Sequence, residues 1–370
     1  MEGLCPYNIM AVLDSQIYEV ELWSRQGVLV ADISVLVKSF NFTMQRNDAE
    51  SFEMTLDLDA FEHLASSIGT MPMVMLNPYR TDIKIKRRGQ YLFGVHVIEI
   101  GTELTEDEAT ITLKAVGYLN LLNDRFITKT YTNTYETDII QDFINETQSQ
   151  PNGDLGITFG NMVQLVQRDR IYERQNIKEG VVNLTKLING NFDIAIDHNK
   201  VLSTYEMIGS DRSLELEFTY PGNIRQLSVP RTGINLYNKI YGIGAGFGDD
   251  QVQSIQQDTA SQLEYGVHEN IYTWNSVLEQ ATLDQNALAR LNITRNMLEI
   301  PQVKVSGRDF DLDQYGIGDR VTVRVTSHPF LNTIDGIYRI ERIAVAVDEN
   351  QDEDITLFFD NDQLESLDNE

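Results

Sequence analysis

Apolar and polar residues alternate along the first third of the chain, which is the period of a half-buried β-strand. The alternation is found in four short segments, at residues 17–23, 40–44, 52–58 and 110–116. Two further apolar runs at residues 82–86 and 91–95 flank the polar sequence Arg87-Arg88-Gly89-Gln90, which predicts a hairpin. Short strands at regular spacing, separated by turn signals, favour a barrel or a sandwich.

The pattern changes to a helical period after Arg125. Four apolar residues share one helical face and predict a helix over residues 138–147: Ile139, Ile140, Phe143 and Ile144. A second helix is predicted at residues 178–189, followed by a hairpin at 192–205. Helices followed by a hairpin are typical of a small α+β domain.

Strand patterns return at residue 214 and reach a glycine run at Gly242–Gly248. Residues 249–262 are polar and are predicted to form a long loop. A helix is predicted over residues 284–298, with Ala287, Leu288, Leu291 and Leu298 on one face. The last predicted strands lie at residues 302–306, 320–325, 338–345 and 355–359. The predicted fold class is therefore mainly β with α+β insertions, with a second β domain interrupted by a helical insert.

The charge of the chain narrows the possible partners. Its 29 basic and 56 acidic residues give a formal net charge of −27, which should repel nucleic acid and anionic membranes. Cys5 is the single cysteine, so no intrachain disulfide is possible and assembly in a reducing cytoplasm is expected. No basic signal region opens the chain, and no apolar stretch reaches the roughly 20 residues of a membrane span, so we expect no membrane insertion.

Metal-binding residues do not cluster in the sequence. The five histidines are scattered, and His96 is expected to be a half-exposed sheet residue. Asp309, Asp311 and Asp313 place carboxylates at alternate positions, as in a calcium loop, but the glycine and glutamate of an EF-hand are missing. The sequence favours a solvated loop there and leaves open whether a cation binds.

No sequence motif for catalysis or for nucleotide binding is present. The glycines of Gly242–Gly248 do not fit a phosphate-binding pattern, and Asp249-Asp250 would repel a phosphate, so we predict no nucleotide there. A Gly-x-Ser-x-Gly elbow is missing too, although triads and carboxylate pairs that assemble only in space stay possible. We predict no catalytic, cofactor-binding or metal-binding residues, and no enzyme activity.

Taken in order, these features resemble the tail-hub or baseplate-hub proteins of tailed phages and related injection machines. The resemblance covers nearly the whole chain. It rests on residues 113–118, Tyr131–Tyr135 with the helix after it, residues 183–205, Tyr237–Tyr241, Tyr265-Gly266, the helix at 284–298, Pro301 and Gly318–Val321.

The resemblance implies a homotrimer whose subunits each carry two tube-like antiparallel β-barrel domains. One barrel would occupy residues 1–125 and the other residues 214–248 and 300–360. The remaining parts would be a small α+β domain at 126–213, a loop and helix insert at 249–299, and an acidic tail at 361–370.

In the virion, such a hub would sit at the tail tip or baseplate after assembly in the host cytoplasm. It would join the six-fold tail tube or a distal tail ring on one face to a three-fold central spike, fibre or tape-measure protein on the other. DNA would pass without specific binding during ejection, through a channel lined by part of the acidic excess, unless that excess serves only solubility. A distal tail or receptor-binding structural protein and a cell-wall-degrading tail enzyme are the alternatives. The sequence does not distinguish a contractile from a non-contractile tail, and it identifies neither the host nor the neighbouring rings.

Overall fold

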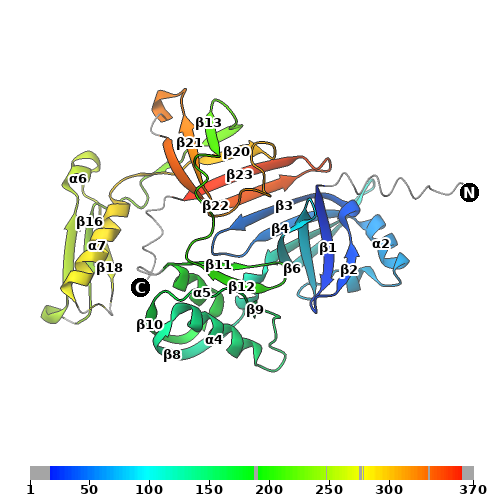
Figure 1. Ribbon diagram of the computed structural model, residues 1–370, viewed down its shortest axis with the longest axis horizontal. Coiled ribbons are helices and arrows are strands. Elements are labelled where there is room, and N and C mark those ends of the chain that lie inside the picture. The colour runs from blue at the N-terminus through cyan, green and yellow to red at the C-terminus, as the bar shows by residue number, and fades with distance from the viewer. Residues whose placement is uncertain are drawn as a thin grey trace, which may run out of the picture.

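The computed structural model describes residues 17–186, 191–246, 248–274, 277, 279–331 and 334–360 (Figure 1). Within these residues the strands form a 13-stranded sheet and four smaller sheets, with few helices. The predicted fold class, mainly β with α+β insertions, is confirmed.

The first strand group comprises β1 to β7, in the spatial order β3-β4-β7-β6-β5-β1-β2. Alternation produces its core: Met54 lies between Phe40 of β3 and Leu113 of β7, and all three are buried. Asp57 ends β4, and its side chain accepts a hydrogen bond from the amide of Ala60. This N-cap begins helix α2, which the sequence pattern did not predict. The bounds are β1 Tyr18–Ser24, β2 Leu29–Asp32, β3 Val37–Gln45, β4 Ser51–Asp57, α2 Leu58–Ser67, α3 Pro72–Met75, β5 Thr81–Arg87, β6 Gln90–Leu104 and β7 Ala109–Gly117.

The second strand group repeats this order. β14-β20-β23-β22-β21-β13 corresponds, strand for strand and in the same chain order, to β3-β4-β7-β6-β5-β1. One pairing differs, because β13 runs parallel to β21 whereas β1 runs antiparallel to β5. The bounds are β13 Glu217–Tyr220, β14 Gln226–Ser228, β20 Gln302–Ser306, β21 Arg320–Val325, β22 Asp335–Val347 and β23 Glu353–Asp360.

The two strand groups meet at β22. One edge of this strand pairs with β23, and the other edge pairs first with β21 and then, over Arg342–Val347, with β3. The pairing of β3 with β22 makes one continuous sheet, and the buried apolar residues of both groups form a single core. The two groups are therefore held at a fixed spacing by backbone hydrogen bonds.

The small unit lies between the two groups in sequence and below the sheet in Figure 1. It contains β8 Phe126–Tyr135, α4 Glu136–Gln148, β9 Thr158–Phe159, β10 Gln167–Asn176, α5 Ile177–Thr185, β11 Asp193–Ile196 and β12 Val201–Tyr205. The predicted apolar face of α4 is fully buried, and the hairpin of β11 and β12 is confirmed. The end of the second predicted helix, at 187–189, lies outside the described residues.

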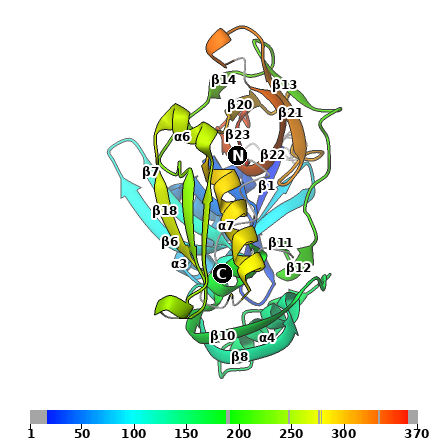
Figure 2. The ribbon, with the colours of Figure 1, turned by 90° about the vertical axis from the view of Figure 1, so that its left-hand side faces the viewer.

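The insert stands apart from the large sheet and has its own small core around Ile240, Trp274 and Leu283 (Figures 1 and 2). It contains β16 Lys239–Ile243, β17 Gln253–Gln257, α6 Thr259–Tyr265, β18 Glu269–Thr273 and α7 Gln280–Thr294, and the strand pair β15 Arg231–Thr232 and β19 Leu298–Glu299 lies next to it in sequence. α7 packs on β16 and β17.

Three sequence expectations need correction in the insert. β16 pairs with β17 and β18, so residues 239–243 belong to the insert's sheet and not to the second strand group. The predicted polar loop at 249–262 contains β17 and the first part of α6. α7 ends at Thr294, so Leu298 lies in β19, and Leu288 is exposed instead of sharing the buried face of Ala287 and Leu291.

Candidate functional site: polar junctions between the units

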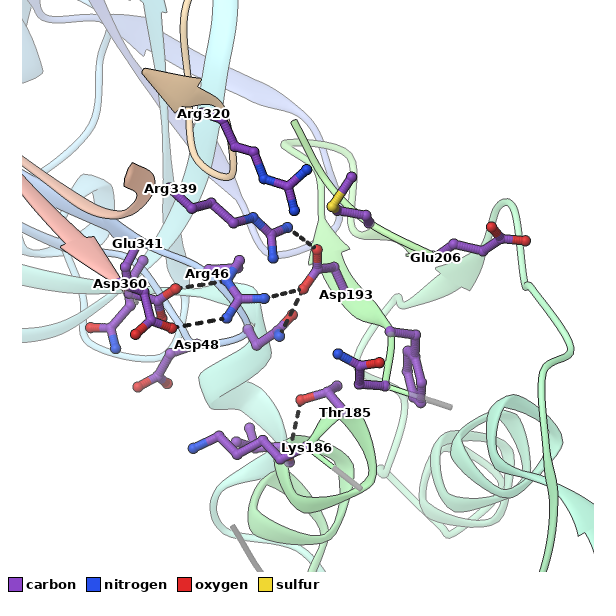
Figure 3. Close-up of a pocket in the computed structure, with 16 residues that line it drawn as sticks. Arg46, Asp48, Thr185, Lys186, Asp193, Glu206, Arg320, Arg339, Glu341 and Asp360 are labelled. Atoms are coloured by element: carbon purple, nitrogen blue, oxygen red, sulfur yellow. Dashed lines mark hydrogen bonds and ion pairs between the residues drawn. The ribbon is translucent and has the colours of Figure 1, made fainter. Parts of the chain in front are cut away.

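Asp193, the first residue of β11, joins the small unit to both strand groups (Figure 3). The residue is 2% exposed, and its carboxylate accepts four hydrogen bonds. From the first group come Arg46 Nη1 at 2.8 Å and Asn47 Nδ2 at 3.0 Å; from the second comes Arg339 Nη2 at 2.7 Å. The backbone amide of Ile208 donates the fourth, at 2.6 Å. Because four donors satisfy both oxygens, this buried carboxylate is fully compensated.

Arg46 extends this junction to the end of the chain's last described strand. Its Nε donates to Glu341 at 2.7 Å, and its Nη2 lies 3.8 Å from Asp360. Burial lowers the pKa of Arg46, but Glu341 and Asp193 outweigh this effect and the net pKa is raised. Burial raises the pKa of Glu341 despite the opposing Arg46. The residues around the junction line a cavity of about 470 Å³, in which cations and carboxylates interleave.

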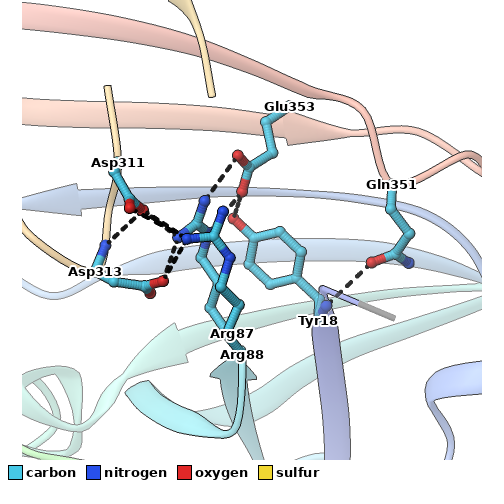
Figure 4. Close-up of polar contacts among 7 residues, drawn as sticks. All are labelled: Tyr18, Arg87, Arg88, Asp311, Asp313, Gln351 and Glu353. Atoms are coloured by element: carbon cyan, nitrogen blue, oxygen red, sulfur yellow. Dashed lines mark hydrogen bonds and ion pairs between the residues drawn. The ribbon is translucent and has the colours of Figure 1, made fainter. Parts of the chain in front are cut away.

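Arg87 forms a second junction, between the two strand groups (Figure 4). This residue ends β5 and is fully buried. Its guanidinium binds Glu353 in a bidentate manner at 2.8 and 3.1 Å and contacts Asp311 at 2.6 Å and Asp313 at 2.7 Å. Tyr18 Oη donates to Glu353 at 2.6 Å. A buried cation surrounded by three carboxylates couples segments that lie far apart in sequence.

The acidic segment at 309–313 is thus not the solvated loop that the sequence favoured. Phe310 is buried in the common core, and Asp309 accepts a hydrogen bond from Ser306 Oγ at 2.6 Å. Burial raises the pKa of Asp311, but the hydrogen bond from Arg87 outweighs it and the net pKa is lowered. Within the described residues no group of His, Cys, Asp and Glu is arranged to hold a metal ion. Two arginines of the chain itself, Arg87 and Arg88, pair with Asp311 and Asp313.

Close packing against α7 and the segment just before it explains Gly242 and Gly244. A Cβ added to Gly244 would lie 2.8 Å from the carbonyl oxygen of Val277, and one on Gly242 would lie 3.3 Å from Cβ of Ala287. Gly246 has a φ of +104°, which side chains rarely adopt. Glycine therefore lets the helix approach β16 closely. The prediction that no nucleotide binds here stays a prediction.

His96 differs from its prediction, because it is 2% exposed. Burial lowers its pKa to about 4, so the imidazole is neutral at physiological pH. His198 stacks on Tyr91 with ring centroids 4.1 Å apart. Cys5 lies outside the described residues. In the part of the chain that the structure describes, no helix is both long and apolar enough to span a bilayer.

Comparison with known proteins gives matches by structure and none by sequence. Neither a protein-family model nor a curated protein matches the chain. The tail protein of Neisseria meningitidis MC58 is 12% identical, with a TM-score of 0.65 over 95% of this chain and 98% of that chain. The 43 kDa tail protein of prophage MuSo2 from Shewanella oneidensis is 14% identical, with a TM-score of 0.66 over 94% of this chain and 99% of that chain.

The prophage tail protein gp18 of Listeria monocytogenes is also similar. It is 14% identical, with a TM-score of 0.57 over 92% of this chain and 94% of that chain. Each match spans almost the full length of both chains, so the similarity includes both strand groups, the small unit and the insert. This chain therefore has the fold of phage and prophage tail proteins, as its sequence resemblance implied.

Proposed function

We propose that this chain is a non-catalytic structural protein of a phage-type tail, acting as the hub of the tail tip or baseplate. The observation that carries the proposal is the repeated strand order within one chain. Two strand groups with the same order lie in one sheet, held together by the pairing of β3 with β22. The full-length structural similarity to tail proteins supports the same role.

A chain with a duplicated strand group can join a six-fold ring to a three-fold one. Three copies of the chain would present six similar groups, which can seat a six-fold tube or distal tail ring on one face. The small unit and the insert occur once per copy, so they would supply three-fold features for a central spike, fibre or tape-measure protein. In this arrangement the two strand groups correspond to the two tube-like domains, and the insert starts near residue 231 instead of 249.

The junctions at Asp193 and Arg87 support a structural role. Buried charges join the small unit to both strand groups at Asp193, and the two strand groups to each other at Arg87. The acidic excess, −27 for the chain, would keep passing DNA from binding if part of it lines the channel of the ring.

Mass photometry and electron microscopy of the purified chain test the proposal. We expect a three-fold ring of three times 42.2 kDa, either alone or on adding its tail-tube partner. A strict monomer under both conditions would contradict a hub. A six-fold ring would instead support the distal tail alternative.

A turnover assay on purified peptidoglycan separates the structural role from the enzymatic alternative. We expect no release of soluble fragments. Release that disappears on replacing one pair of carboxylates would establish a tail enzyme and overturn the structural reading.

A further inference from the structure

A cleft of about 780 Å³ lies between the first strand group and the small unit. One wall is the turn from Trp23 to Gly27 together with Asp82 and Lys84 of β5. The other wall consists of two loops of the small unit, at residues 152–156 and 198–200. The cleft is separate from the junctions at Asp193 and Arg87, and nothing in the proposed tail role uses it.

Lys84 is a buried cation on this wall whose contacts differ from those of its neighbours. It is 7% exposed, its Nζ donates to Asn199 Oδ1 at 2.9 Å, and it lies 4.0 Å from the centroid of the Trp23 ring. Lys86 and Lys200, in contrast, form ion pairs with Glu21 at 2.5 Å and with Asp82 at 2.7 Å. Among the described residues no carboxylate pairs with Lys84 within 4.0 Å. An ammonium group has three donors, so Lys84 can bind an anion in addition to Asn199.

The charges that line the cleft favour an anion of single charge. Arg25, Lys84 and Lys200 face Asp82 and Asp154, which leaves one net positive charge in a chain of net charge −27. Arg25 Nη2 donates to the carbonyl oxygen of Asp154 at 2.8 Å, which holds its guanidinium at the rim. Burial lowers the pKa of Lys84, because it disfavours the charged ammonium. A bound anion would favour the ammonium and oppose this shift.

We propose that this cleft binds a small organic molecule that carries one carboxylate on a ring. The carboxylate would be held by Lys84 and Arg25, and the ring would pack on Trp23 and on His198, which is fixed by its stacking on Tyr91. A phosphate dianion fits less well, because its two negative charges exceed the one net positive charge of the residues that line the cleft. The proposal does not depend on the role of the chain in a tail.

Trp23 provides the signal for the test. The chain has two tryptophans, and Trp274 lies in the separate core of the insert, so a Trp274→Phe variant reports on the cleft alone. Glucuronate is the probe, uncharged glucose is its matched control, and inorganic phosphate tests the charge preference. We expect a saturable change in Trp23 fluorescence with glucuronate, and much weaker changes with glucose and phosphate.

Two variants locate the binding. Lys84→Met and Arg25→Gln should each weaken glucuronate binding about tenfold or more, since each removes a hydrogen bond to a charged group. Lys38→Met is the control, because Lys38 is paired with Asp57 on the same strand group and does not line the cleft. Arg25 is exposed, so its replacement leaves the fold intact even if Lys84→Met does not fold.

Four results would overturn the proposal. No saturable change with glucuronate would exclude the ligand class. Equal binding of glucose would exclude carboxylate recognition, and stronger binding of phosphate would exclude the preference for a single charge. Unchanged glucuronate binding by Arg25→Gln, or by a folded Lys84→Met, would place the site elsewhere.

Discussion

Replacing Asp193 by alanine should loosen the small unit from both strand groups. The change removes the acceptor of four hydrogen bonds, two of which come from the guanidinium groups of Arg46 and Arg339. Arg46 retains Glu341 at 2.7 Å. The side chain of Arg339, which is 4% exposed, loses the carboxylate of Asp193 and keeps its hydrogen bonds to the carbonyl oxygens of Gly318 at 3.1 Å and Ile208 at 2.8 Å.

Breaking a buried ion pair from one side costs about 3–5 kcal/mol, because the remaining charge stays buried. The retained contact of Arg46 with Glu341 places the expected loss near the lower end, at about 3 kcal/mol. The stability of Asp193→Asn should lie between that of the wild type and that of Asp193→Ala. The amide oxygen of asparagine can still accept hydrogen bonds, but its amino group faces other donors.

Hydrogen exchange measured by mass spectrometry gives a local reading of this loss. The amide of Ile208 donates to Asp193, and the amide of Ile194 donates to the side chain of Asn47. A loss of about 3 kcal/mol in local opening corresponds to exchange about 100-fold faster at these two amides. A local reading is preferable to one unfolding midpoint, since a chain of several units need not unfold in one step.

Asp354→Ala is the matched control. Asp354 pairs with Arg225 at 3.2 Å and with Lys304 at 3.0 Å, but its side chain is 49% exposed, so the expected loss is below about 1 kcal/mol. If Asp193→Ala changed exchange at Ile208 no more than the control does, the carboxylate would not hold the units together and the reasoning would be wrong.

Three further predictions concern other buried groups. Burial raises the pKa of Glu50 to about 7 from an ordinary 4.5, so the folded chain keeps a proton that the unfolded chain releases, and stability falls as pH rises through that window. The free energy of unfolding, measured by denaturant titration at pH 4.5 and 7.5, should differ between the two pH values by up to about 3 kcal/mol less in Glu50→Gln than in the wild type. The same difference in both proteins would contradict this prediction. Arg87→Met removes the buried guanidinium from Glu353 and leaves Asp311 and Asp313 with the exposed Arg88 alone, so thermal melting should occur earlier at neutral pH and be partly restored by Ca²⁺ or acid, whereas Arg225→Met at an exposed pair should respond to neither. Gly244→Ala places Cβ 2.8 Å from a carbonyl oxygen and should destabilise the insert by about 1–3 kcal/mol, while Gly316→Ala, with open space, should not; equal melting curves would refute the packing argument.

Local patterns determined many of the elements and the fold class. In β4, Phe52, Met54 and Leu56 are buried in alternation, as their spacing predicts, because a strand of period two turns every second side chain to the same core. In α4, Ile139 and Phe143 lie on one buried face for the corresponding helical reason. Such preferences depend on neighbours along the chain, so the sequence carries them.

The polar sites were decided by tertiary contacts alone. In β5, Asp82 and Lys84 alternate with Ile83 and Ile85, the pattern of a strand with one face in water, yet the structure buries both faces. Lys84 meets Asn199, which is 115 residues away, and Asp193 meets Arg339, which is 146 residues away. A charged residue on a strand has the same spacing whether water or another unit covers it. Only the packing of the small unit against the sheet decides whether that charge is solvated or must find a buried partner.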